Sequence, residues 1–269
     1  MANTMDLYGD DGLMDALITR IFPQTFDGTF IDDKVTKLGM YALYYQSEIK
    51  QIRLPMVKEL SNYALAHSGV TSLNDESLPI CTVISNYAFQ YCQSLKSVAL
   101  TAVTSLGGNA FQNCPLLESI SLPNYAGAVN SYTFADCTAL KEIDLPKVTS
   151  AMGSSFTKCH ALRKVTLPSA TKLIAAFMSC NSLEVINLPA IVNLGTNQVS
   201  QSRKMREINL GPNLTTIDKT AFNQAPSGMI VNMAISEGAI EGAPWGGTDI
   251  IINYDVPYHE GTVEEEETT

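Results

Sequence analysis

The chain has 269 residues, of which 45% are apolar and only 16% are charged, against about 25% charged residues in an average globular domain. Its net charge of −10 gathers at the two ends, with four Asp among the first twenty residues and five Glu among the last ten. The near-neutral charge of the central residues argues against nucleic-acid binding. The chain has no run of 18 apolar residues, which argues against membrane insertion.

The first 34 residues precede any repeat, and we expect residues 1–34 to form an N-terminal segment and cap. Residues 10–22 place Leu13, Leu17 and Ile21 at helical spacing, and an Asp at the start of this stretch can cap the helix. Such a helix would shield the first repeat or dock onto a partner. No basic stretch followed by an apolar one opens the chain, so we expect no secretory signal peptide.

Residues 35–225 consist of repeats of 21 to 25 residues. Five copies share the pattern Cys-x-x-Leu-x-x-(Ile or Val)-x-Leu, with Pro following in four of them, and a small residue followed by Phe precedes each copy. The Cys positions are 22, 23, 22 and 21 residues apart: Cys92, Cys114, Cys137, Cys159 and Cys180. Less regular copies lie near Gln46, near Val70 with an insertion at Asn74–Ser77, and near Ser202, where the Cys is missing.

The spacing predicts a solenoid of stacked coils. In each copy the Ile or Val and the following Leu lie two residues apart, so both side chains point to one face of a short strand. One such strand cannot bury its apolar face alone, but about eight to nine coils stacked in parallel form one continuous core. We expect the Phe of each copy to fill the opposite side of its coil.

These motifs resemble the BspA-type, or Treponema-type, leucine-rich repeat over about residues 35–225. The resemblance implies a right-handed leucine-rich-repeat β-solenoid with one parallel sheet. It also implies a place among the surface and adhesion proteins of bacteria or the structural proteins of bacteriophages. The stretches at residues 15–20 and 236–246 are most similar to the phage-encoded members.

The five repeat Cys should stack as a column inside the solenoid. Neighbouring coils lie about 4.8 Å apart, so Cα separation alone would permit disulfides, but side chains at equivalent positions run parallel and fit a disulfide poorly. An odd number would also leave one Cys unpaired. We expect buried free thiols, with disulfides or a metal site as alternatives, and no Cys-x-x-Cys pair supports zinc.

The outward strand positions form two columns. The first mostly alternates in charge, which predicts pairing between adjacent strands: Lys96, Glu118, Lys141, Arg163, Glu184 and Arg206. The second is small and polar: Ala99, Ser121, Asp144, Thr166, Asn187 and Asn209. The two columns are either a solvated ladder or a binding face. For the latter, the candidate residues are Lys141, Asp144, Arg163, Thr166, Glu184 and Asn187.

The rest of the chain offers no catalytic arrangement. Its three His (His67, His160 and His259) lack neighbours suggesting a triad or a metal site, and no phosphate-binding glycine loop occurs. We expect residues 226–256 to form a C-terminal cap around Trp245, and residues 257–269 to be a solvated acidic tail. The sequence therefore predicts a non-enzymatic protein without metal or cofactor.

The resemblance and the missing signal peptide favour a bacteriophage virion protein, a head or tail decoration or fibre that presents the solenoid for attachment. The alternatives are a bacterial cell-surface adhesin and an intracellular protein-binding scaffold. The expected partners are other virion or surface proteins, together with a host-surface protein or glycan, and the protein would be oligomeric within an assembly. The expected location is the virion, with the bacterial cell surface as the alternative.

Overall fold

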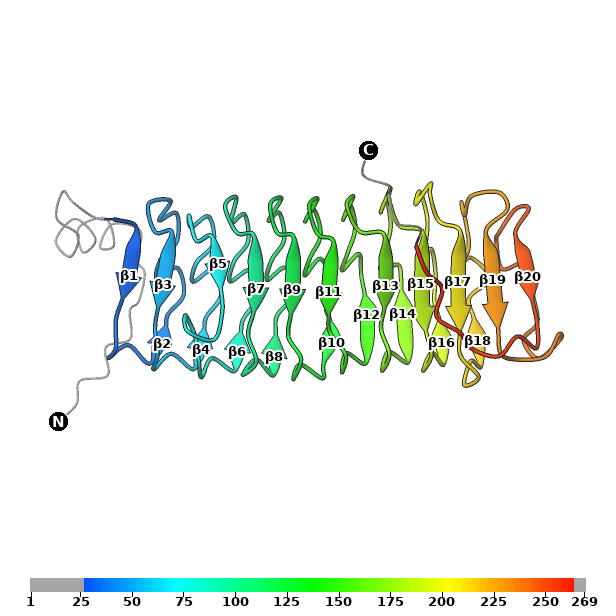
Figure 1. The fold of residues 1–269 in the computed structure, drawn as a ribbon, viewed down its shortest axis with the longest axis horizontal. Coiled ribbons are helices and arrows are strands. Elements are labelled where there is room, and N and C mark those ends of the chain that lie inside the picture. The colour runs from blue at the N-terminus through cyan, green and yellow to red at the C-terminus, as the bar shows by residue number, and fades with distance from the viewer. Residues whose placement is uncertain (1–26, 264–269) are drawn as a thin grey trace.

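The computed structural model describes residues 27–263, which form an elongated parallel β-solenoid without helices (Figure 1). One face carries eleven strands: β1 (Thr29–Ile31), β3 (Gln51–Arg53), β5 (Ser72–Leu73), β7 (Ser97–Ala99), β9 (Ser119–Ser121), β11 (Glu142–Asp144), β13 (Lys164–Thr166), β15 (Val185–Leu188), β17 (Glu207–Leu210), β19 (Ile230–Met233) and β20 (Ile251–Asn253). The other carries nine: β2 (Lys37–Leu38), β4 (Glu59–Leu60), β6 (Val83–Ile84), β8 (Ser105–Leu106), β10 (Ala128–Val129), β12 (Ser150–Met152), β14 (Lys172–Ile174), β16 (Asn193–Leu194) and β18 (Thr216–Ile217). The helix predicted over residues 10–22 lies outside the described residues.

The parallel solenoid of stacked repeats is confirmed, with more coils than expected. Strands β1, β19 and β20 extend the first face into the ranges predicted as caps. Equivalent repeat positions lie opposite one another, for example Val98 beside Ile120 and Val165 beside Ile186. This register is expected because a slip of one residue would turn the apolar side chains outward.

The prediction of a single parallel sheet needs revision, because a second strand in most coils builds a second face. The first face consists of the sheets β1-β3, β5-β7-β9-β11 and β13-β15-β17-β19-β20. The second consists of β2-β4-β6-β8 and β10-β12-β14-β16-β18. Strands on the second face have only two or three residues, so they are too short to display a recognisable alternation in the sequence.

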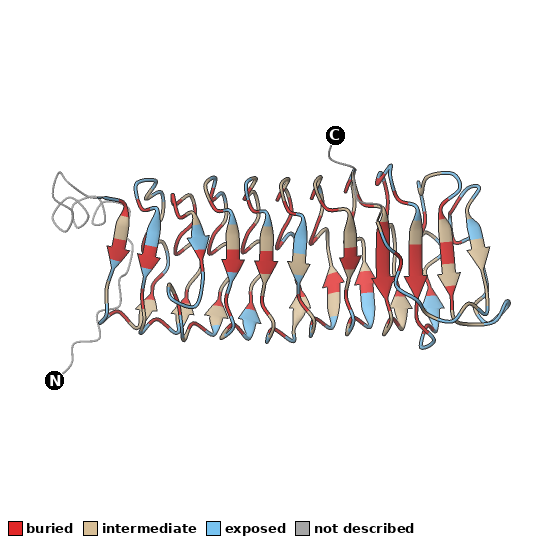
Figure 2. Cartoon of the chain, viewed as in Figure 1, coloured by how far each residue is buried: buried red, intermediate tan, exposed pale blue. Residues whose placement is uncertain are grey.

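A stack of aromatic rings fills the side of the core predicted for the repeat Phe residues. The rings of Phe89, Phe111, Phe134, Phe156 and Phe177 are fully buried and nearly parallel, with centroids 5.2–5.6 Å apart. Val199 replaces Phe in the next coil, and Phe222 then meets the buried ring of Trp245 edge to face. The Nε1 of Trp245 donates to the carbonyl of Glu241 at 2.9 Å. The buried residues run along the whole solenoid (Figure 2).

The column of Cys side chains lies next to this stack. All six Cys are buried and form no disulfide. The thiols of Cys114, Cys137, Cys159 and Cys180 donate at 3.0–3.2 Å to the carbonyl of the repeat Phe one coil earlier. Ser202, which stands where the next Cys would be, donates in the same way to Phe177 at 2.9 Å. The position therefore needs a small donor, because an unpaired carbonyl in the core is destabilising.

Candidate interaction surfaces

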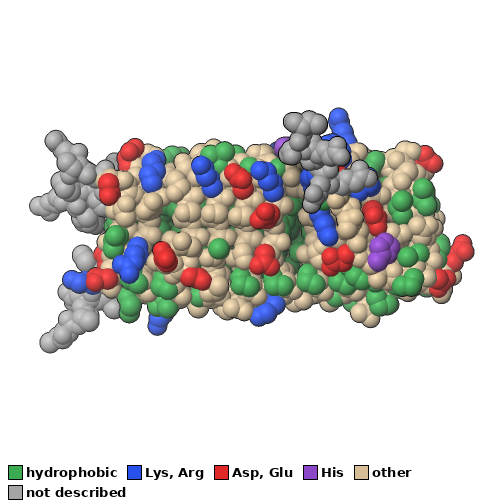
Figure 3. Space-filling model, viewed as in Figure 1, with side chains coloured by type: hydrophobic (Ala, Val, Ile, Leu, Met, Phe, Trp, Pro, Cys, Tyr) green, Lys and Arg blue, Asp and Glu red, His purple; other side chains and the backbone are tan. Residues whose placement is uncertain are grey.

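The predicted charge column pairs with itself along the first face. Lys141 lies 3.5 Å from Glu118. Glu184 lies between two cations, with its carboxylate 2.8 Å from Arg163 and 3.4 Å from Arg206. Where this face is visible in Figure 3, positive and negative side chains are interspersed. The Lys141–Glu118 pair is exposed and contributes little to stability, whereas the side chain of Glu184 is only 13% exposed between its two cations.

The small polar column divides into an exposed part and a buried part. Asp144 is exposed and accepts a hydrogen bond from Ser121 at 2.6 Å, and Thr166 is half-buried. Asn187 and Asn209 also point outward from their strands but are buried, so the column is not solvent-exposed at these two positions as expected. They are covered because residues 257–263, predicted to be a solvated tail, fold back over β15. In the sequence, only Val185 hints that β15 is covered, because it is an apolar residue at an outward strand position.

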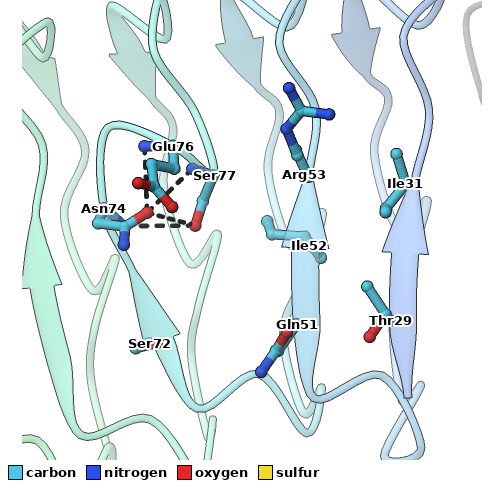
Figure 4. Close-up of a pocket in the computed structure, with 9 residues that line it drawn as sticks. All are labelled: Thr29, Ile31, Gln51, Ile52, Arg53, Ser72, Asn74, Glu76 and Ser77. Carbon is cyan, nitrogen blue, oxygen red and sulfur yellow. Dashed lines mark hydrogen bonds between the residues drawn. The ribbon is translucent and has the colours of Figure 1, made fainter. Parts of the chain in front are cut away.

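An open hollow of about 340 Å³ lies at the N-terminal end of the first face. Outward residues of β1, β3 and β5 form its floor, including Gln51 and Arg53, and the loop Asn74–Ser77 forms its wall (Figure 4). Asn74 holds this loop, because its Oδ1 accepts from the backbone N–H groups of Glu76 and Ser77 at 3.1 and 3.0 Å. The insertion noted in the sequence therefore shapes a polar recess, and its lining contains no His or Cys.

Seven rings form an aromatic surface on the arcs that lead from the second face to the first in the early coils: Tyr41, Tyr44, Tyr45, Tyr63, His67, Tyr87 and Tyr91. Tyr41, Tyr63 and Tyr87 stack in one row, with centroids 5.1 and 4.6 Å apart. Tyr45, His67 and Tyr91 stack in a second row, at 4.2 and 4.8 Å. Tyr44 packs edge-on against the first ring of each row. Tyr45 is 60% exposed and Tyr91 is 38% exposed.

All six rings in the two rows stand on left-handed backbone, with φ between 58° and 61°. This conformation costs an L-residue about 1–2 kcal/mol, and Asn or Asp tolerate it better than bulky residues. In later coils the second-row position is indeed occupied by mostly small or polar residues: Asn113, Asp136, Lys158, Ser179 and Gln201. Stacking offsets part of the cost, at about 0.5–1.5 kcal/mol per pair. The later coils keep the same backbone conformation with other residues, so the conformation itself does not require Tyr or His at these positions.

Burial favours the uncharged form of three of these rings, as the direction of each pKa shift shows. Burial lowers the pKa of His67 below its ordinary value of 6.5. Burial also raises the pKa of Tyr44 and Tyr63 above 10.0, with smaller contributions from neighbouring Tyr hydroxyls. Sequence reasoning missed these rings, although Tyr41, Tyr63 and Tyr87 recur at one repeat position.

Residues 27–263 offer neither a cluster of metal ligands nor a membrane-spanning helix. That part of the chain contains no group of three or more His, Cys, Asp or Glu arranged to hold a metal ion. It likewise contains no helix long and apolar enough to cross a membrane.

The solved structures to which the chain is similar include several bacterial leucine-rich repeat proteins. A leucine-rich repeat protein from Bacteroides ovatus matches with a TM-score of 0.62 and 17% identity, over 84% of this chain and 57% of its own. The T. pallidum leucine-rich repeat protein matches with a TM-score of 0.48 and 21% identity, over 71% and 83%. A leucine-rich cell surface protein from Faecalibacterium prausnitzii gives 0.36 and 18%, over 83% and 78%. This chain thus spans little more than half of the Bacteroides protein. At 17% identity, the similarity shows a common fold and nothing more.

The family assignment comes from the sequence. Comparison with curated proteins gives no match. The family model described as the BspA type leucine-rich repeat region matches residues 24–124 and 104–228, with six copies. These ranges cover most of the chain and include every regular repeat. The chain therefore belongs to the BspA-type leucine-rich repeat family.

Proposed function

We propose that the protein is a non-enzymatic attachment module that binds a partner protein through its aromatic surface. The observation that carries the proposal is the placement of five Tyr and one His in two stacked rows, whereas in later coils small or polar residues fill most of the same positions and Tyr132 stands without a ring beside it in its row. Tyr is enriched at protein interfaces because it combines a large apolar ring with a polar end. The rigid coils beneath would present the rings with little loss of conformational freedom on binding.

A protein partner fits this surface better than a glycan does. Tyr63 and His67 each lie between two stacked rings, so their faces are covered, and a stacked ring leaves a face open only at the ends of the two rows. A sugar ring packs against an open aromatic face, whereas a protein surface can use ring edges and hydroxyl groups. The glycan, expected alongside a host-surface protein as a partner, is therefore the second candidate.

The setting that we propose is the surface of a bacteriophage particle, with the bacterial cell surface as the alternative and an intracellular scaffold as the third choice. The similarity of residues 15–20 and 236–246 to phage-encoded members favours the particle. Mass spectrometry of purified particles and of proteolytically shaved cells distinguishes the settings, because the protein should be abundant in only one of them.

A photo-crosslinking amino acid placed at position 91 tests the proposed partner surface. In cultures that make the protein, we expect this position to form an adduct with one protein species, because Tyr91 stands exposed at the end of its row. The matched control is the same amino acid at position 158. Lys158 has the same left-handed backbone and its Nζ lies 3.1 Å from Asp136, outside the aromatic surface. Equal adducts from both positions, or none from position 91, would contradict the proposal.

A further inference from the structure

The described part of the C-terminal segment, residues 257–263, runs back from β20 and lies across the outer face of β13, β15 and β17 (Figure 1). At its centre, the N–H of Gly261 donates to Oδ1 of Asn187 at 3.0 Å. The Nδ2 of Asn187 donates in return to the carbonyl of Gly261 at 3.4 Å. This two-point pairing lets the side-chain amide of Asn187 recognise the backbone of an extended segment.

Charged groups on both sides of Asn187 contact the residues flanking Gly261. The carboxylate of Glu260 lies 3.6 Å from Nζ of Lys164 on β13. The carbonyl of Thr262 accepts a hydrogen bond from Arg206 at 3.2 Å, immediately before β17. The ring of His259 lies 3.4 Å from the carboxylate of Glu207. The segment is therefore held over three successive strands by both backbone and side-chain contacts.

The site admits only glycine at its centre. A Cβ on Gly261 would lie 2.8 Å from Cγ1 of Val185 and 2.8 Å from Nδ2 of Asn209. Neither neighbour can move aside, because Val185 is buried and Asn209 belongs to a ladder of amides. Asn209 donates to Asn187 at 2.9 Å and accepts from Asn232 at 2.8 Å.

The receiving surface also departs from the pattern of the preceding coils. The outward position filled by Val185 carries Ser97, Ser119, Glu142 and Lys164 in the four preceding coils. Val185 is fully buried because the backbone of Gly261 lies over it, whereas Ile251, at the equivalent position of the last coil, is 50% exposed. Val185 and the backbone of Gly261 thus form complementary halves of one contact.

We propose that the outer face of β13, β15 and β17 is a peptide-binding site for an extended acidic segment of the type Glu-Gly-Thr, and that residues 259–262 occupy it within the same chain. A partner that presents a segment of this chemistry binds by displacing them. The tether gives the chain's own segment an effective concentration in the range of about 1 mM, so the occupied site excludes weaker ligands. This site is separate from the aromatic surface, and each can be tested without the other.

The test uses the full chain carrying Gly261→Val and a fluorescent peptide with the sequence of residues 257–263. The added side chain should expel the chain's own segment, and hydrogen exchange measured by mass spectrometry should then rise in residues 258–263. The peptide should bind this variant at least about tenfold more tightly than it binds the unchanged chain, as measured by fluorescence anisotropy, because the site is no longer occupied. A peptide carrying Val in place of its Gly should not bind.

Two further substitutions identify the residues that make the site. Adding Asn187→Ala to the Gly261→Val chain should abolish peptide binding. Because Asn187 is buried in the amide ladder, Arg206→Ala provides a second test at a half-exposed position, where binding should weaken several-fold while the unfolding midpoint stays unchanged. Unchanged hydrogen exchange in the Gly261→Val chain would overturn the proposal. So would release of the segment without peptide binding at about 1 mM, the concentration that a short tether supplies.

Discussion

Replacing Phe134 with Ala should lower the free energy of unfolding by about 3–5 kcal/mol, whereas Lys141→Ala should change it by no more than about 1 kcal/mol. Phe134 is fully buried in a central coil, between the rings of Phe111 at 5.6 Å and Phe156 at 5.3 Å. Its removal leaves a cavity that neighbouring coils, held in register by their strands, cannot fill. The side chain of Lys141 is 62% exposed and loses only an ion pair with Glu118.

Urea denaturation followed by circular dichroism measures both effects. Phe134→Leu is the matched control, because it keeps an apolar side chain in the stack, and its loss should fall between those of the two Ala variants. Equal losses for Phe134→Ala and Lys141→Ala would show that the assignment of inside and outside positions is wrong.

Alkaline pH should destabilise the protein strongly between pH 9 and 12. Burial raises the pKa of Cys137 and of Cys180 from 9.0 to about 12. The unfolded chain loses these thiol protons near pH 9, while the folded chain retains them until about pH 12. The contribution of each thiol to stability is therefore complete below pH 9. As the pH rises through this interval, each thiol lowers the free energy of unfolding by about 1.4 kcal/mol per pH unit.

Cys137→Ser isolates the effect of one thiol. Serine keeps a donor for the carbonyl of Phe111, as Ser202 does for Phe177, but it has no proton to lose in this range. Urea denaturation at several pH values should show a decline that is shallower by about 1.4 kcal/mol per pH unit in the variant. An identical pH dependence in both chains would mean that Cys137 is not a buried thiol in solution.

The regular repeat made the core predictable. A spacing of about 22 residues placed the strand residues, the Phe stack and the Cys column in register, because each coil repeats the contacts of its neighbours. The same reasoning placed Trp245 in the packed C-terminal region, where it covers Phe222. These features follow from local pattern alone.

The two proposed binding surfaces involve residues that differ from one coil to the next or lie outside the repeats. The contact between Gly261 and Asn187 joins residues 74 positions apart, and no periodicity connects a segment after the last repeat with the coil that it covers. The rings of Tyr45, His67 and Tyr91 do occupy one repeat position, yet their left-handed backbone becomes visible only in the structure. Sequence periodicity describes what the coils share, whereas recognition depends on where they differ.

The double substitution Tyr45→Asn with Tyr91→Asn tests most directly whether the aromatic surface exists for binding. Asn adopts left-handed backbone at lower cost than Tyr, which should compensate for most of the three lost aromatic contacts, two with His67 and one with Tyr44. We expect the urea midpoint to stay within about 1 kcal/mol of the unchanged chain, and the partner identified by crosslinking at position 91 to be no longer retained. A large loss of stability with the partner still bound would show that the rings only hold the first coils together, and would contradict the proposed function.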